Sequence, residues 1–213
     1  MMLLLLWTLL SFLSGSMMFS YWLGRIARRD LKQQGDGNPG AMNLWKSAGH
    51  WYGLSGIVLD WAKGYVPILL LLHAGAFTSD SNRLLLPSAA AILGHMFSPF
   101  LRGKGGKGIA VTFGVWSALT MFTASLAFAI ILALLMVIVR LIDRSRSGFH
   151  SSETDGVQVV LGMVLLGGYL AAADYSSAIQ WFWLLSVLLL GYSHRREWRR
   201  FYSRIVHHRT PPL

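Results

Sequence analysis

Seven apolar runs constrain the fold of this chain more than any other feature of its sequence. A helix needs about 20 apolar residues to cross a bilayer. Several runs are shorter, so we expect helices that are tilted or bounded by loops that dip into the protein. Charged residues make up only 13% of the chain, about half their share in a soluble domain. The sequence therefore predicts an all-α membrane protein in which residues 1–213 form one domain, a seven-transmembrane-helix bundle. The runs cover residues 3–23, 51–74, 84–101, 109–123, 125–141, 157–173 and 178–193.

The positive charges indicate how this bundle is oriented, because Lys and Arg collect on the cytoplasmic side of a membrane. With the N-terminus outside, 17 of the 19 Lys and Arg residues fall on the inner side, Arg83 lies outside and Lys63 lies within a span. Reading 109–141 as one long helix would remove this bias, so we expect two helices broken near Thr123. The C-terminus is then cytoplasmic, in a cell (inner) membrane protein. The inner segments are 24–50, 102–108, 140–156 and 194–213.

Composition and charge narrow the possible functions. The chain has no cysteine, which excludes disulfides, a thiolate nucleophile and a cysteine-based metal site. Its net charge of +10 fits attraction to anionic lipid or phosphate ligands at a membrane. We therefore expect no nucleic-acid partner. The first apolar run lacks a preceding basic region and is too long for a cleavable signal. We expect membrane lipids and small anionic substrates as partners, and no obligate protein partner is evident.

The segment GHMFSPFLRGKGGKG, Gly94–Gly108, ends in a glycine–lysine loop, residues 102–108. Glycines allow positive φ and let a ligand approach the backbone N–H groups, and a concave row of N–H groups with flanking cations binds anions. A helix is expected from Ile109, with its positive end at the loop. No Walker spacing fits the loop. It is either a phosphate cradle at the membrane surface or a basic loop that only orients two helices.

A second polar cluster is GDGNPGAMN in the first inner segment. Its glycines, asparagines and proline predict a tightly turned backbone. Asn38 and Asn43 could donate amide hydrogen bonds to a phosphate or hydroxyl, and Asp36 is a possible acceptor or base. An ordinary cluster of turns is the alternative.

Other polar residues stand within or beside the apolar runs. Asp60 and Lys63 lie inside the second run, where each charge costs about 2.5–3.5 kcal/mol on insertion scales. Their spacing lets them pair on one helix face, as a clamp between helices or as part of a site. His95 is either a hydrogen-bonded core residue or a site residue. His194 and Arg195 open the basic tail, as a membrane anchor or as part of a site.

These polar clusters converge on the derived topology. The first inner segment, the glycine–lysine loop and the start of the tail all reach the inner face, with Asp60 and Lys63 just below it. Together they could enclose an anionic head group while an acyl chain lies between helices. This arrangement predicts chemistry on an amphiphile that carries phosphate.

Five segments resemble, in order, the motifs of the bacterial acyl-phosphate glycerol-3-phosphate acyltransferases, the PlsY family. SGSMMFSYWLG resembles GSxPxxYLxG, with Met17 or Met18 in place of the proline. DLKQQGDGNPGAMN resembles D[IL]RxxGSGNxGATN, and LDWAKGYVP resembles LDxxKGxxP. GHMFSPFLRGKGGKG resembles GHxFPxFLxFKGGKG, with Pro99 displaced by one position. SHRREWRRF is a weaker match to RHRxNIxRL.

The resemblance implies seven membrane helices with an outer N-terminus. It also implies transfer of an acyl chain from acyl-phosphate to the 1-hydroxyl of glycerol 3-phosphate, which forms lysophosphatidate for phospholipid biosynthesis. No side-chain acyl intermediate, metal or cofactor takes part. We place Lys107, His194 and Asp36 in the catalytic set, and Asp60 and Lys63 as a structural pair. The predicted substrate- and phosphate-binding residues are Gly37, Asn38, Gly40, Asn43, Lys46, Lys63, His95, Lys104, Gly105, Gly106, Gly108, Arg195 and Arg200.

The chain departs from the family pattern at three further motif positions. Asp36 replaces a serine, Met42 a threonine and Glu197 the tail asparagine. Two carboxylates beside a phosphate repel it unless they pair with Lys or Arg, or they recognise a hydroxyl or an amine. Two alternatives therefore stay open: acyl transfer to a different small polar acceptor, and a non-catalytic membrane protein that binds anionic lipid.

Overall fold

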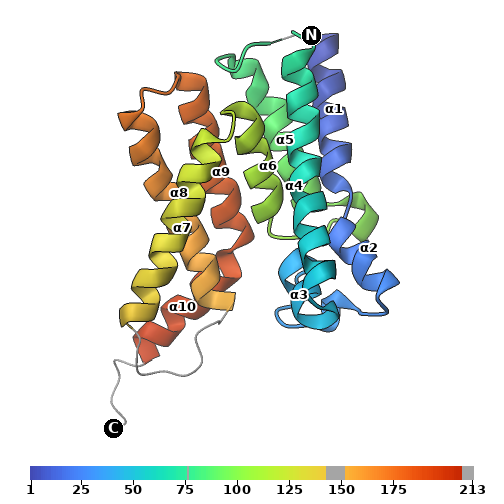
Figure 1. Cartoon of the computed structure of the whole chain (residues 1–213), viewed down its shortest axis with the longest axis vertical. Coiled ribbons are helices and arrows are strands. Elements are labelled where there is room, and N and C mark those ends of the chain that lie inside the picture. The colour runs from blue at the N-terminus through green and yellow to red at the C-terminus, as the bar shows by residue number, and fades with distance from the viewer. Residues whose placement is uncertain (76, 143–151, 208–213) are drawn as a thin grey trace.

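The computed structural model describes residues 1–75, 77–142 and 152–207, and the regular structure in these ranges is helical throughout (Figure 1). Short 3₁₀ turns η1 (Leu31–Gln33), η2 (Asn82–Leu84) and η3 (Pro99–Leu101) join several helices. The α-helices are α1 (Met2–Ser16), α2 (Phe19–Ile26), α3 (Ala41–Ala48), α4 (His50–His73), α5 (Leu85–Met96), α6 (Ile109–Leu119), α7 (Thr123–Ile142), α8 (Ser152–Ala172), α9 (Ser177–Ser193) and α10 (Arg195–His207).

Five helical stretches in the described ranges are long and apolar enough to cross a membrane. They are Met2–Ile26, His50–His73, Asn82–Leu101, Thr123–Leu141 and Thr154–Ala172. The apolar helices α6 and α9 are shorter, with 11 and 17 residues. The all-helical architecture with several candidate membrane spans is therefore confirmed, whereas seven complete spans and the orientation of the termini stay predictions.

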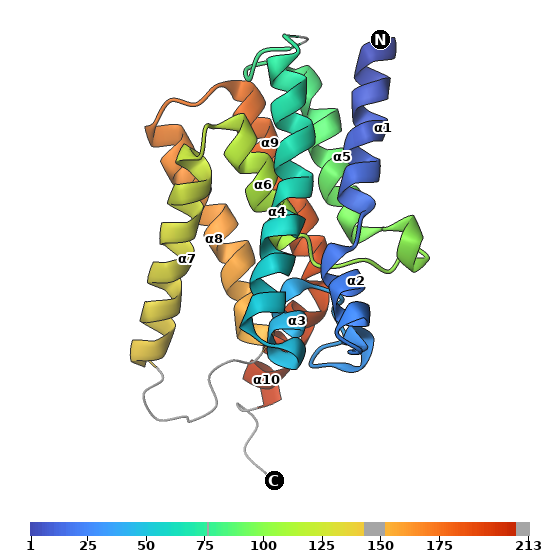
Figure 2. The ribbon, with the colours of Figure 1, turned by 45° about the vertical axis from the view of Figure 1, so that its right-hand side comes forward.

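The run 109–141 forms two helices, and the turn between α6 and α7 explains why. Met121 and Phe122 both have positive φ, at 48° and 69°, which ends a right-handed helix. At 1.5 Å per residue, α6 is only about 16 Å long. A helix of that length covers about half of a 30 Å hydrocarbon core. The loop before α6 therefore dips into the protein, and Figure 2 shows the chain between α5 and α6 well inside the length of the bundle.

The first run differs from the single helix expected over 3–23. The helix stops after Ser16 and restarts at Phe19, because Met17 and Met18 are not helical. The ammonium group of Lys63 donates a hydrogen bond to the backbone oxygen of Met17. The break thus exposes a carbonyl oxygen that the buried lysine satisfies, a link between two motifs that the sequence pattern does not reveal.

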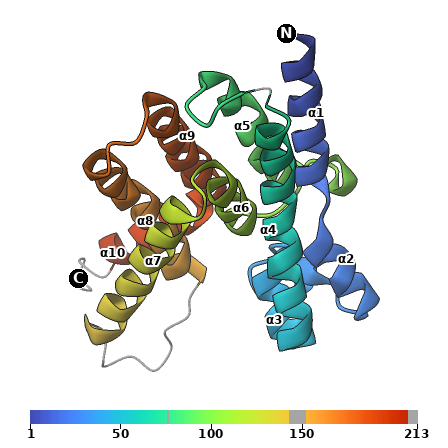
Figure 3. The ribbon, with the colours of Figure 1, turned by 45° about the horizontal axis from the view of Figure 1, so that its top comes forward.

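Small residues bring the first helices of the bundle close together. Gly15 of α1 lies against the backbone of Ala91 in α5, and Gly64 of α4 lies against the backbone of Val111 in α6. Such close approach is typical of helix packing in membranes. Figure 3 shows α7, α8 and α9 grouped beside this set, and α3 and α10 lie at the end opposite the N-terminus (Figure 1). The polar loop expected at 143–156 lies mostly outside the described residues, and α8 begins earlier than expected, at Ser152.

Candidate functional site

Three distant parts of the chain meet at the ammonium group of Lys107 in the glycine–lysine loop. Its Nζ atom lies 2.5 Å from Oδ2 of Asp36, in the first inner segment, and 2.8 Å from Oε1 of Glu197, in the first turn of α10. The side chains of Lys107 and Asp36 are each 16% exposed, and that of Glu197 is 9% exposed. The structure thus brings together the loop, the first segment and the tail that the sequence placed on one face.

Asn43 holds the first inner segment in its turned shape. Its side-chain Nδ2 lies 2.8 Å from Oδ1 of Asp36 and 2.9 Å from each of the backbone oxygens of Gln34 and Asn38, so its two N–H bonds are shared among three acceptors. The N–H of Asn38 also donates to Oδ1 of Asp36, at 3.1 Å. Gly37 has φ of 75°, which a non-glycine residue adopts only at a cost. This network fixes the position from which the carboxylate of Asp36 reaches Lys107.

The glycines of the glycine–lysine loop serve a different purpose from the expected row of free N–H groups. The N–H of Gly105 donates to the backbone oxygen of Met96 at 3.0 Å, and that of Gly106 donates to the backbone oxygen of His95 at 3.1 Å. A Cβ on Gly105 would lie 1.8 Å from the oxygen of His95, and one on Gly106 would lie 2.3 Å from the His95 ring. These two glycines therefore let the loop pack against the end of α5.

His95 supports this loop from below. Its side chain is 4% exposed, and its Nδ1 atom has no hydrogen-bond partner among the described residues. Gly108 ends the loop with φ of 84° and begins α6 without a side-chain cap. His95 therefore lies behind the loop and positions it, while a direct role in phosphate binding stays a prediction.

The electrostatics of the site depend on the two carboxylates. Burial by itself lowers the pKa of Lys107, but the hydrogen bonds and charges of Asp36 and Glu197 outweigh this effect, so the pKa is raised above its ordinary value. Burial lowers the pKa of His194 below its ordinary value, and the charge of Lys107 lowers it further. The hydrogen bond to Leu190 and the two carboxylates oppose that shift. At neutral pH, Lys107 is therefore a cation and His194 is neutral.

His194 is held in place by its neighbours at the junction of α9 and α10. Its Nδ1 atom lies 2.9 Å from the backbone oxygen of Leu190 and 2.9 Å from Oγ of Ser193. The Ser193 hydroxyl also lies within hydrogen-bonding distance, 2.9 Å, of the backbone oxygen of Lys107. The tail and the glycine–lysine loop are thus joined by a backbone contact as well as by the Glu197 ion pair.

Asp60 and Lys63 form a separate, buried cluster. Lys63 Nζ lies 2.8 Å from Asp60 Oδ1, with both side chains at most 3% exposed. Ser20 donates to Asp60 Oδ2 at 2.5 Å, and Ser14 donates to the backbone oxygen of Lys63 at 2.8 Å. These contacts join α1, α2 and α4, and they favour the structural pair over a phosphate-binding role for Lys63.

The remaining predicted cations are exposed. Lys46, Lys104, Arg195 and Arg200 all lie at the surface, and within the described ranges none of them forms an ion pair. Arg195 Nη1 donates to the backbone oxygen of Tyr192 at 2.8 Å, and its guanidinium lies 4.1 Å from the centre of that ring. The binding roles of these four side chains stay predictions.

Glu197 is the site residue that the sequence prediction left out. Its only signal in the sequence was its departure from the tail motif, in which the family has asparagine at this position. Glu197 lies three residues after His194, so the two side chains are about one helical turn apart. No spacing rule could show that its carboxylate reaches a lysine 90 positions earlier in the chain.

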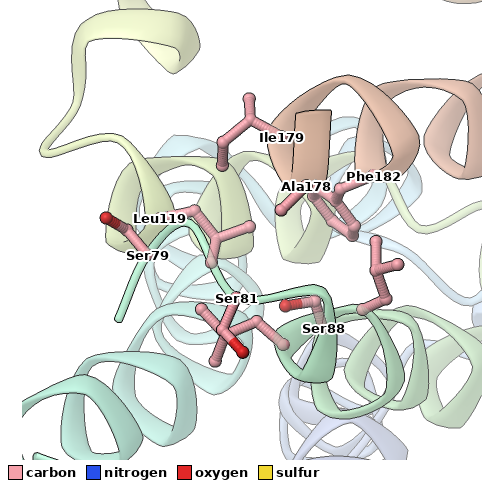
Figure 4. Close-up of a pocket in the computed structure, with 9 residues that line it drawn as sticks. Ser79, Ser81, Ser88, Leu119, Ala178, Ile179 and Phe182 are labelled. Atoms are coloured by element: carbon pink, nitrogen blue, oxygen red, sulfur yellow. The ribbon is translucent and has the colours of Figure 1, made fainter. Parts of the chain in front are cut away.

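The pocket in Figure 4 is unrelated to this cluster. It lies at the opposite end of α5 from the glycine–lysine loop, and Ser81, Ser88, Leu119, Ile179 and Phe182 are among its lining residues. The residues that line it are all uncharged, so it lacks the cations that a phosphate needs. No group of three or more potential metal ligands occurs in the part of the chain that the structure describes.

The chain is similar to known acyltransferases along nearly its whole length. A family model described as "Glycerol-3-phosphate acyltransferase" matches residues 5–204. Glycerol-3-phosphate acyltransferase 1 of Thermotoga maritima is 35% identical over 196 residues, which cover 90% of this chain and 94% of that relative. The glycerol-3-phosphate acyltransferase of Leptospira borgpetersenii serovar Hardjo-bovis (strain JB197) is 44% identical over 114 residues, 52% of this chain and 51% of that relative.

Two solved structures share the fold. Both are of PlsY (YgiH), described as an integral membrane glycerol 3-phosphate acyltransferase. The glycerol 3-phosphate form aligns with a TM-score of 0.75 at 26% identity and covers 99% of this chain and 95% of that one. The lysphosphatidic acid form aligns with a TM-score of 0.78 at 25% identity, covering 94% and 92%. The chain therefore belongs to the PlsY family of integral membrane glycerol-3-phosphate acyltransferases.

Proposed function

We propose that this protein moves an acyl chain from an acyl-phosphate to the 1-hydroxyl of glycerol 3-phosphate, releasing lysophosphatidate and inorganic phosphate. The observation that carries the proposal is the meeting of three motif segments at Lys107, the partly buried cation of the glycine–lysine loop. The solved relatives support the acceptor, since they are described as a glycerol 3-phosphate form and a lysphosphatidic acid form.

The reaction needs positioning and charge stabilisation more than covalent chemistry. The acceptor hydroxyl attacks the acyl carbonyl carbon, the new C–O bond forms, and the bond from that carbon to the phosphate oxygen breaks. Lys107 stabilises the negative charge on the departing phosphate, an interaction that strengthens as the charge develops. Asn38, Gly40 and Asn43 shape one wall, and Lys46 and Arg200 supply further cations to the phosphates. No side chain carries the acyl group.

The membrane setting determines how the donor enters. An acyl chain is accommodated between apolar helices while its phosphate reaches the glycine–lysine loop. The charge distribution supports a seven-span, single-domain protein of the cell (inner) membrane with this site on the cytoplasmic face. The water-soluble acceptor then comes from the cytoplasm and the product stays in the bilayer.

Phosphate release from palmitoyl-phosphate by the purified protein, with and without glycerol 3-phosphate, tests this proposal. We expect release that depends on glycerol 3-phosphate, and a loss of about 100-fold or more in Lys107→Ala, because one preorganised charge is removed. Lys32→Ala is the matched control, since Lys32 is exposed in the first inner segment. The thermal unfolding midpoint of each variant is measured alongside, because Lys107→Ala leaves two carboxylates without their cation.

The outcome also separates the alternatives. A wild-type protein that binds palmitoyl-phosphate but never consumes it would contradict the proposal and support a lipid-binding protein. The carboxylates of Asp36 and Glu197 favour a second candidate, transfer to a hydroxyl or amine acceptor without phosphate. A set of acceptors assayed with one donor distinguishes this candidate, which requires a higher kcat/KM for an acceptor other than glycerol 3-phosphate.

A further inference from the structure

The second carboxylate oxygen of Glu197 is buried and unused. Glu197 is 7% exposed, and its Oε1 atom is 2.8 Å from Lys107 Nζ. Its Oε2 atom accepts no hydrogen bond from any residue that the structure describes. A buried acceptor without a donor costs about 1–3 kcal/mol, more for a charged group. Because buried polar atoms are almost always satisfied, an open oxygen beside a predicted phosphate-binding lysine indicates a place for a ligand's hydrogen-bond donor.

The side chain of Glu197 is also held in one position. An added Cβ on Gly156 of α8 would lie 2.9 Å from both Cβ and Cγ of Glu197, so α8 packs tightly against the carboxylate's stem. Oε1 is fixed at the other end by Lys107. A carboxylate that is gripped on both sides is preorganised, which is what positioning in a reacting complex requires.

The other carboxylate at Lys107, Asp36, differs from Glu197 in this respect. Asp36 uses Oδ1 for Asn43 and Asn38, and Oδ2 for Lys107, so its oxygens already have donors. His194 is the other possible base, because a neutral imidazole whose Nδ1 donates to Leu190 keeps a lone pair on Nε2. Of the two carboxylates at Lys107, only Glu197 has an oxygen that lacks a hydrogen-bond donor among the described residues.

We propose that Glu197 is the catalytic base of this protein, a role that rests on the acyl transfer proposed above. Oε2 accepts the hydrogen bond of the acceptor hydroxyl while Oε1 stays on Lys107. As the hydroxyl oxygen bonds to the acyl carbon, its proton moves to Oε2, and the acyl carbon–phosphate oxygen bond breaks. The proton then passes from Oε2 to the released phosphate, which returns Glu197 to its carboxylate form.

This arrangement couples the two halves of the reaction through one ion pair. The same Glu197–Lys107 pair holds the nucleophile on one side and the leaving phosphate on the other. Nucleophile and leaving group are therefore brought to one place by residues of α10 and the glycine–lysine loop. In the family pattern this position is an asparagine, which cannot accept a proton in this way, so the base is a property of this chain.

Glu197→Gln tests the proposal because it keeps the shape of the side chain and removes the base. We expect kcat for glycerol-3-phosphate-dependent phosphate release to fall about 100-fold or more, the usual contribution of a general base. KM for glycerol 3-phosphate should change less than about threefold, because binding is largely retained. Asp80→Asn, an exposed acid outside the site, is the matched control and should keep wild-type kcat.

A second variant separates a base from a structural role. Formate added to Glu197→Ala should raise the kcat of this variant at least about tenfold above its value without formate, because a small carboxylate can occupy the vacated space and take the proton. A kcat for Glu197→Gln within about threefold of wild type would overturn the proposal, as would a folded Glu197→Ala that formate does not rescue. If wild-type protein releases no phosphate in response to glycerol 3-phosphate, the proposed function itself fails.

Discussion

At the scale of single residues, the proposed function makes Asp36 a competitor of the substrate phosphate for Lys107. Asp36→Ser removes one of two carboxylates on the same ammonium group, while Asn43 keeps its bonds to the backbone oxygens of Gln34 and Asn38. We expect the KM for glycerol 3-phosphate to fall by about fivefold, equivalent to roughly 1 kcal/mol for one partly exposed ion pair. Steady-state phosphate release at varied glycerol 3-phosphate measures it.

The control for this change is Asp80→Ser, which removes an exposed acid far from Lys107 along the chain and should leave KM unchanged. A folded Asp36→Ser protein that loses all transfer would show instead that Asp36 is itself catalytic or recognises the acceptor. The two results differ in direction, so a single titration decides between them.

Residue patterns predicted which segments form the site but left its atomic pairing unknown. Motif resemblance and charge bias placed Asp36, Lys107 and the tail on one face, and the structure joins them. The pairing of Lys107 with a carboxylate 71 positions away depends on how helices pack, and local periodicity carries no information about that. The same holds for the bond from Lys63 to the backbone oxygen of Met17, since nothing in the apolar run 3–23 marks its break.

At the scale of elements, the turn from α5 into the glycine–lysine loop leaves no room for a side chain at Gly105. A Cβ there would lie 1.8 Å from the backbone oxygen of His95, so Gly105→Ala must displace the loop or the end of α5. We expect phosphate release to fall by about 100-fold or more, since a shift of about 1 Å in a positioned group has this effect. Activity and the thermal unfolding midpoint are measured together.

Gly168→Ala in α8 is the matched glycine control, because its added Cβ meets nothing within 4 Å. Alanine in a helix is favoured over glycine by about 0.5–1 kcal/mol, so this variant should be slightly more stable and fully active. Full activity in Gly105→Ala would show that the loop tolerates displacement and that its packing on His95 does not position Lys107.

At the scale of the whole molecule, the short helix α6 explains what the apolar pattern could and could not predict. Within the described ranges each apolar run coincides with an apolar helical stretch, and the break near Thr123 is present. The length of an apolar run does not reveal, however, how far the loop beside it reaches into the protein. The structure gives α6 only 11 residues, and the side chain of Lys107 in the loop before it is only 16% exposed.

The predicted orientation of the bundle can be tested by labelling single cysteines from one side of the membrane. The chain has no cysteine, so single cysteines can be placed at Gln33, Asp80 and Met121, all exposed in the structure. A membrane-impermeant maleimide added to intact spheroplasts should label Asp80→Cys and Met121→Cys, because both connections face outward in the seven-span topology. Gln33→Cys should react only after lysis. External labelling of Gln33→Cys would show that the protein has the opposite orientation and would contradict a site on the cytoplasmic face. Protection of Met121→Cys until lysis, with Asp80→Cys labelled, would show that α6 does not cross. The chain between α5 and α7 would then have to follow a different path if Lys107 lies on the inner side of the membrane.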